Sequence, residues 1–75
     1  MKKITSIANL SNIRTGWGFY TDKAGQRVSA FKLLEDCIIV LDAKEIKAKT
    51  GDYLILVKGQ LTYSKGTIFD KKHEK

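Results

Sequence analysis

Three consecutive stretches decide the fold: Trp17-Gly18-Phe19-Tyr20-Thr21, Asp22-Lys23-Ala24-Gly25 and Gln26-Arg27-Val28-Ser29-Ala30-Phe31. The first is rich in aromatic residues, which favour strands, and the third shows an imperfect alternation of the apolar residues Val28, Ala30 and Phe31. The middle stretch is typical of a tight turn, because glycine adopts positive φ at no steric cost and aspartate tolerates turn geometry. The sequence therefore predicts a β-hairpin with strands at Trp17–Thr21 and Arg27–Leu34.

Turn signals recur on both sides of this hairpin, at Thr15–Gly16, Thr50–Asp52 and Ser64–Gly66. Regular spacing of such signals between apolar runs indicates a small barrel or sandwich of short strands. Three further strands are expected: a long curved strand at Lys3–Arg14, a fourth at Tyr53–Tyr63 and a fifth at Thr67–Asp70.

The segment between the third and fourth strands divides into two halves. Cys37–Leu41 has the composition of a strand, whereas Asp42–Lys49 predicts a short helix. Asp42 is a favourable N-cap, Glu45 stands at the capping-box position, and Gly51 follows the segment as a helix stop. Lysines in the last turn complement the helix dipole.

Length and composition indicate one globular domain. The chain has 75 residues, of which 43% are hydrophobic and 29% charged, as in a folded domain rather than a disordered chain. We expect a domain over residues 1–70 and a basic, frayed tail over 71–75. No apolar run approaches the roughly 18 residues of a membrane span, and the polar N-terminus does not have the pattern of a secretory signal. A cytoplasmic location is therefore expected, with the single Cys37 as a buried hydrophobic residue.

The strongest functional signal in the composition is charge. Fourteen Lys and Arg residues against eight Asp and Glu give a net charge of +6 and an isoelectric point near 9.6. Such a balance favours a polyanionic partner, because lysine and arginine neutralise phosphates and release counterions. Basic charge also serves solubility alone, so this feature does not identify the partner by itself.

Two motifs resemble those of the nucleic-acid-binding OB-fold domains of anticodon-binding and of DNA replication and repair proteins. Gly18–Asp22, followed by Gly25 and Arg27–Phe31, is similar to their second and third strands, and Thr50–Leu61 is similar to their fourth. The resemblance implies a mostly β fold: a five-stranded Greek-key barrel with one short helix between strands three and four. It also implies a small stand-alone module of the single-stranded DNA-binding type, of the kind carried by mobile elements and used in DNA replication.

The binding face implied by this resemblance centres on strands two and three and the loops beside them. Aromatic side chains there stack on bases and cations neutralise phosphates. Phe19 and Tyr20 point to opposite sides of a strand, and we assign Phe19 to the core and Tyr20 to the face. Trp17, between two glycines, is expected in an exposed loop. The nucleic-acid-binding residues predicted from the sequence are Arg14, Trp17, Tyr20, Lys23, Arg27, Phe31, Lys32, Tyr63 and Lys65.

The sequence does not predict an enzyme, a cofactor or a metal site. It holds a single cysteine and a single histidine, too few for the usual zinc ligand sets, and no glycine-rich phosphate loop is present. The predicted function is non-catalytic binding of single-stranded nucleic acid, DNA before RNA. The alternative is a small β-barrel that binds a protein partner, such as a replication protein, or a second copy through an open strand edge, with its charge incidental.

Overall fold

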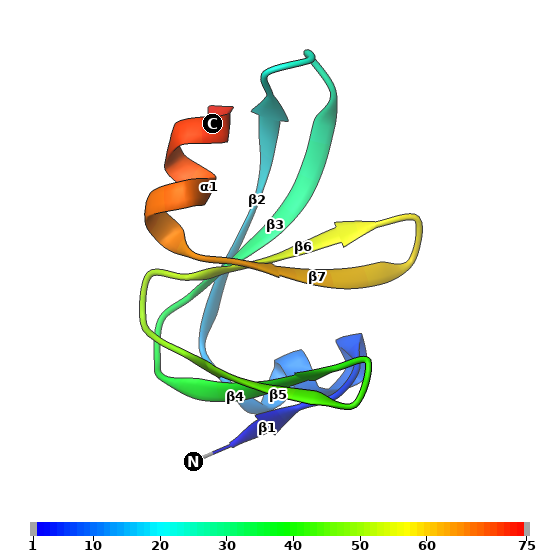
Figure 1. The fold of residues 1–75 in the computed structure, drawn as a ribbon, viewed down its shortest axis with the longest axis vertical. Helices are drawn as coiled ribbons and strands as arrows, with labels where there is room; N and C mark the ends of the chain where they lie inside the picture. Colours follow the sequence, from blue (N-terminus) through cyan, green and yellow to red (C-terminus); the bar gives the residue numbers. More distant parts are fainter. Residues whose placement is uncertain (1, 75) are drawn as a thin grey trace.

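The predicted aromatic hairpin forms the long arm of a five-stranded antiparallel sheet (Figure 1). The computed structural model describes residues 2–74. In it, β2 (Thr15–Asp22) pairs with β3 (Arg27–Leu33) along seven residue pairs, from Thr15↔Leu33 to Thr21↔Arg27. The strand order in this sheet is β7-β6-β3-β2-β8. Its other members are β6 (Tyr53–Val57), β7 (Gln60–Ser64) and β8 (His73–Glu74).

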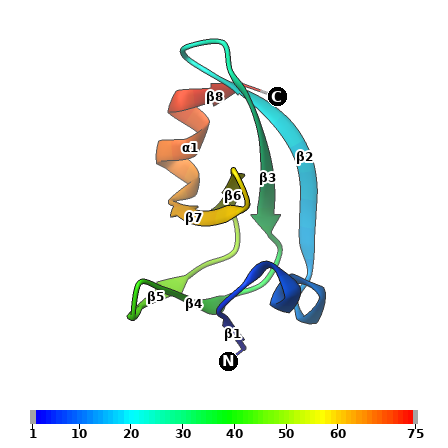
Figure 2. The ribbon, with the colours of Figure 1, turned by 90° about the vertical axis from the view of Figure 1, so that its right-hand side faces the viewer.

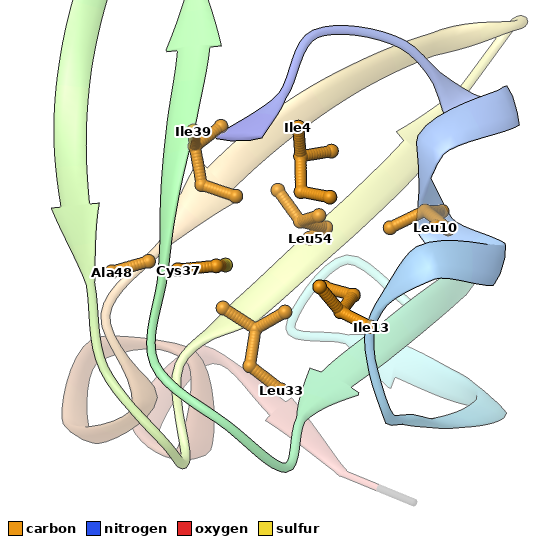
Figure 3. Close-up of a cluster of buried hydrophobic side chains, with 8 residues drawn as sticks. All are labelled: Ile4, Leu10, Ile13, Leu33, Cys37, Ile39, Ala48 and Leu54. Atoms are coloured by element: carbon orange, nitrogen blue, oxygen red, sulfur yellow. The ribbon is translucent and has the colours of Figure 1, made fainter. Parts of the chain in front are cut away.

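A second sheet of three strands covers one end of the first. It has the order β1-β4-β5 and comprises β1 (Lys3–Ile4), β4 (Cys37–Leu41) and β5 (Lys44–Ala48). Between β1 and the long hairpin lies a 3₁₀ helix, η1 (Ile7–Asn12). The main core fills the space between the two sheets and η1 (Figure 3). Its buried members are Ile4, Leu10, Ile13, Leu33, Cys37, Ile39, Ala48 and Leu54.

The predicted helix at Asp42–Lys49 is wrong, because these residues form the turn and second strand of a hairpin. Asp42 and Ala43 have φ of 51° and 64°, which is the backbone of a type I′ turn between paired strands. The pairing places Ile46 opposite Ile39 and Ala48 opposite Cys37. The alternating pattern that buries Ala48 and partly buries Ile46 thus outweighs the helix-capping residues.

The predicted long strand at Lys3–Arg14 is also wrong beyond its first residues. Only Lys3–Ile4 is a strand, and η1 follows with a capping box in which Asn9 accepts a hydrogen bond from the Ser6 N–H. The predicted fourth strand, Tyr53–Tyr63, is instead the β6–β7 hairpin, since Lys58 and Gly59 take positive φ and turn the chain.

The predicted fifth strand at Thr67–Asp70 lies within an α-helix, α1 (Gly66–Lys72). Phe69 is the buried residue of this helix, and its ring stacks on Tyr53 at 3.9 Å and on His73 at 4.1 Å. A helix aims Phe69 at the sheet while its basic last turn, Lys71 and Lys72, complements the dipole. The tail expected to fray was 71–75. Its first two lysines complete α1, and His73–Glu74 pair with β2. Lys75 lies outside the described residues.

The mostly β class is confirmed, with two sheets as its architecture. Residues 2–74 form no closed five-strand barrel, and the segment between β3 and β6 is the β4–β5 hairpin rather than a helix. Within the same residues, no helix has the length and apolar character needed to cross a membrane.

The β4–β5 turn yields a test that separates this hairpin from a helix. Ala43 holds a left-handed conformation that is strained for a residue with a Cβ. We therefore expect Ala43→Gly to raise the free energy of unfolding by about 0.5–1 kcal/mol in urea titrations. In a helix, the same change would lower it by about 1 kcal/mol. The matched control is Ala24→Gly in the β2–β3 turn, where φ is not positive and glycine is expected to be neutral or destabilising.

Candidate nucleic-acid interface

The two faces of the β2–β3 hairpin have different surroundings. Successive strand residues point to opposite sides, and directly paired residues share a side. The pairs Trp17↔Phe31, Phe19↔Ser29 and Thr21↔Arg27 lie on one face, whereas Tyr20↔Val28 and Gly18↔Ala30 lie on the other. Figure 2 shows α1 beside the second face and no element against the first along the upper part of the hairpin.

The uncovered face carries two large aromatic side chains in water. Trp17 is 56% exposed and Phe19 is 49% exposed. Their ring centroids are 4.7 Å apart in an edge-to-face arrangement, a favoured geometry for two aromatic rings. Phe31, opposite Trp17, is partly buried because its other side packs on the main core. We call Trp17, Phe19, Arg27 and Phe31 the aromatic face.

Arg27 places a cation within the aromatic face. Its guanidinium carbon lies 5.7 Å from the centroid of the Phe19 ring, within the range of a cation–π contact. Arg14 and Lys23, both exposed, stand near the two ends of β2. Arg14 lies within 3.9 Å of the Glu35 carboxylate, whereas the ion pairs formed by residues 2–74 include neither Lys23 nor Arg27. The face therefore has cations at both ends of an aromatic centre.

The assignments of Phe19 and Tyr20 have to be exchanged. Tyr20 lies on the covered face, where its ring meets Phe69 at 4.9 Å and Tyr53 at 5.7 Å, both edge-to-face. Tyr20 therefore anchors α1 to the sheet and is removed from the aromatic face. The sequence pattern that could have placed Phe19 on the exposed face is its two-residue spacing from Trp17. In a strand, this spacing puts both rings on one side, but Trp17 was expected in a loop.

Lys32 and Lys65 also lie away from the aromatic face. Lys32 pairs with Gly16 and Tyr53 on the covered side, and Lys65 precedes α1. Both border a shallow depression of about 340 Å³ that also contains Asp52 and Asp70. The two carboxylates offset the lysine charge, so this depression is a poor site for phosphate.

Tyr63 is a structural residue. Its hydroxyl donates a 2.6 Å hydrogen bond to Asp52 Oδ2, and its ring packs on the main core. Burial, together with the bond to Asp52, raises the pKa of Tyr63 to about 12. Tyr63 therefore lies apart from the aromatic face, with its hydroxyl already bonded to Asp52.

Asp52 connects three parts of the chain. Its carboxylate also accepts hydrogen bonds from the backbone N–H groups of Lys49, at 3.0 Å, and Gly66, at 3.1 Å. Partial burial raises the pKa of Asp52, but the hydrogen bonds from Lys49, Tyr63 and Gly66 and the nearby charge of Lys65 outweigh it and leave the pKa lowered. The charged form is thus favoured in the folded state.

The cysteine and the potential metal ligands do not form a second site. Cys37 is fully buried, as predicted, and this burial raises the pKa of its thiol. No group of three His, Cys, Asp or Glu side chains gathers within residues 2–74 in a way that would hold a metal ion.

Comparisons of the chain with protein families, with curated proteins and with solved structures found no match.

Asp52 makes a pH dependence expected. A lowered folded-state pKa means that the stabilisation is complete above about pH 5, begins to decline near the ordinary carboxyl pKa of about 3.9, and is lost as the pH falls through the lower pKa of the folded state. We expect Asp52→Asn to lower the free energy of unfolding at pH 7 by roughly 1–3 kcal/mol and to reduce its dependence on pH between 5 and 3. Urea unfolding followed by circular dichroism measures both effects.

The matched control for this variant is Glu45→Gln. Glu45 forms an exposed ion pair with Lys3 at 3.2 Å, and such pairs contribute less than about 1 kcal/mol. Equal losses in the two variants, or an unchanged acid dependence in Asp52→Asn, would contradict the role assigned to Asp52.

Proposed function

We propose that the protein binds single-stranded nucleic acid on the aromatic face, without catalysis. The observation that carries the proposal is the exposed Trp17–Phe19 pair with the Arg27 guanidinium over Phe19. Exposing two large aromatic rings to water is unfavourable in free energy, and a partner that covers them would remove this apolar surface from solvent. Exposed apolar patches of this kind mark binding sites. A ligand with flat, apolar faces and negative charge complements this combination.

Unpaired bases and their phosphates meet both requirements. Each base stacked on an aromatic ring contributes about 1–3 kcal/mol, and this stacking is available only where the base is not paired within a duplex. Arg27, Lys23 and Arg14 lie along the same hairpin and would neutralise phosphates beside the stacked bases. The net charge of +6 adds a long-range attraction for the same ligand.

The position of the aromatic face also agrees with the function implied by the resemblance to OB-fold domains. In those domains the second and third strands form the binding surface, and the aromatic face lies on β2 and β3 of this chain. A closed barrel is not required, since β2 and β3 support the face by pairing with each other. We place single-stranded DNA first and RNA second as the ligand.

Titration of a fluorescent oligothymidine with the protein measures the affinity and tests the proposal. Trp17→Ala and Phe19→Ala are each expected to weaken binding by about 1–3 kcal/mol, with little change in melting temperature because an exposed side chain leaves no cavity. Arg27→Ala is expected to weaken binding and reduce its salt dependence. Competition with single-stranded RNA and duplex DNA at two salt concentrations then ranks the ligands.

Ile68→Ala is the control for the aromatic variants, because Ile68 is 46% exposed on α1, and Lys72→Ala is the control for Arg27→Ala. Neither control is expected to change the affinity by as much as its counterpart. Absence of binding at micromolar protein and low salt, or equal weakening by Ile68→Ala and Trp17→Ala, would refute the proposal.

A further inference from the structure

A second surface lies between the β6–β7 and β4–β5 hairpins. It is a groove of about 600 Å³ in which the loop after β1 supplies the third side. Figure 2 shows the tips of the two hairpins apart on this side of the molecule. The apolar residues that line it are Ile7, Val40, Leu41, Ile46, Leu61 and Tyr63. No residue of the aromatic face borders this groove, so the two surfaces are separate.

The strand beside the groove, β7, differs from the other sheet edges. The edges of the two sheets within residues 2–74 are β1, β5, β7 and β8. β1, β5 and β8 each contain at least one charged residue, whereas β7 reads Gln60-Leu61-Thr62-Tyr63-Ser64. Charged residues protect strand edges against pairing with other chains. The β7 edge lacks this protection.

The β7 edge also has main-chain groups in position for another strand. β6 and β7 are joined by the two-residue turn Lys58–Gly59, which makes Val57↔Gln60 the closing hydrogen-bonded pair. Hydrogen-bonded and non-hydrogen-bonded pairs alternate along an antiparallel ladder. Leu61 and Tyr63 therefore direct their N–H and C=O groups away from β6, toward the open edge.

The charges around β7 favour an acidic partner over a second copy of this chain as the occupant of the edge. Lys58 and Lys65 flank β7, and Lys44 begins β5 next to the groove. Asp42, in the β4–β5 turn, is the one acidic residue that lines the groove. A second copy paired antiparallel to β7 about Thr62 would bring Lys58 of one chain close to Lys65 of the other at both ends. Each chain also has a net charge of +6, so self-pairing is opposed by repulsion.

We propose that the β7 edge and the adjoining groove bind an extended peptide of a partner protein by strand addition. The peptide has an uncharged, alternately apolar centre and acidic residues at its ends. Its main chain would pair with Leu61 and Tyr63, its apolar side chains would enter the groove, and its carboxylates would face Lys58 and Lys65. Main-chain pairing supplies affinity in this type of recognition, and the side-chain pockets supply specificity.

The test uses a synthetic peptide of alternating valine and threonine with two aspartates at each end. A second peptide with lysines in place of the aspartates is the control. We expect the acidic peptide to bind in calorimetry and to slow amide hydrogen exchange at Leu61 and Tyr63. The double variant Lys58→Glu with Lys65→Glu is expected to weaken binding roughly tenfold or more. Lys23→Glu with Lys72→Glu, which changes the net charge equally, is expected to leave most of the affinity intact.

Three results would overturn the proposal. The first is absence of binding, or binding without slower exchange at Leu61 and Tyr63. The second is equal affinity for the two peptides, or equal weakening in the two double variants, which would reduce the effect to net charge. The third is a dimer in light scattering with Leu61 and Tyr63 amides protected in the absence of peptide, because a second copy would then occupy the edge.

Discussion

The carboxylate of Asp52 is the interaction on which the arrangement of the two sheets and α1 depends. It accepts hydrogen bonds from the Lys49 N–H at the end of β5, the Tyr63 hydroxyl on β7 and the Gly66 N–H at the start of α1. The backbone of Asp52 also accepts a 2.8 Å hydrogen bond from the Leu33 N–H at the end of β3. One residue thus connects four elements, of which β3, β7 and α1 are distant from it in sequence.

Gly66 makes this arrangement possible through its lack of a side chain. A Cβ at this position would collide with the backbone carbonyl of Gly51, which precedes Asp52. The close approach brings the Gly66 N–H within reach of the Asp52 carboxylate and sets the direction in which α1 leaves β7. Phe69 then reaches Tyr20 and Tyr53 on one side of the sheet. On the opposite side of β2 and β3, η1 and the main core cover only the lower part of the hairpin, and the aromatic face is exposed above them.

The sequence predicted the parts of the fold in which local signals and tertiary packing agree. The β2–β3 hairpin follows from its aromatic strands and the turn at Asp22–Gly25, and Cys37–Leu41 follows from its apolar run. The prediction failed at Asp42–Lys49, where capping residues indicate a helix but the partner strand β4 selects the alternating pattern. It failed again at Thr67–Asp70, because the contacts that favour a helix there come from Tyr53 and Asp52, far away in sequence.

The candidate site was predicted only where its residues are placed by local signals in the sequence. Trp17, Arg27 and Phe31 share a face because they lie on adjacent strands whose register is set by a local turn. Tyr20, Lys32 and Tyr63 were misplaced because their sides of the sheet are decided by α1 and by Asp52, which no local pattern reveals. With Phe19 in place of Tyr20, the uncovered side of β2 carries two exposed rings in contact with each other. A helix anchored by Tyr20 requires one aromatic residue of β2 on the covered side, and the alternation of the strand then leaves both Trp17 and Phe19 in solvent.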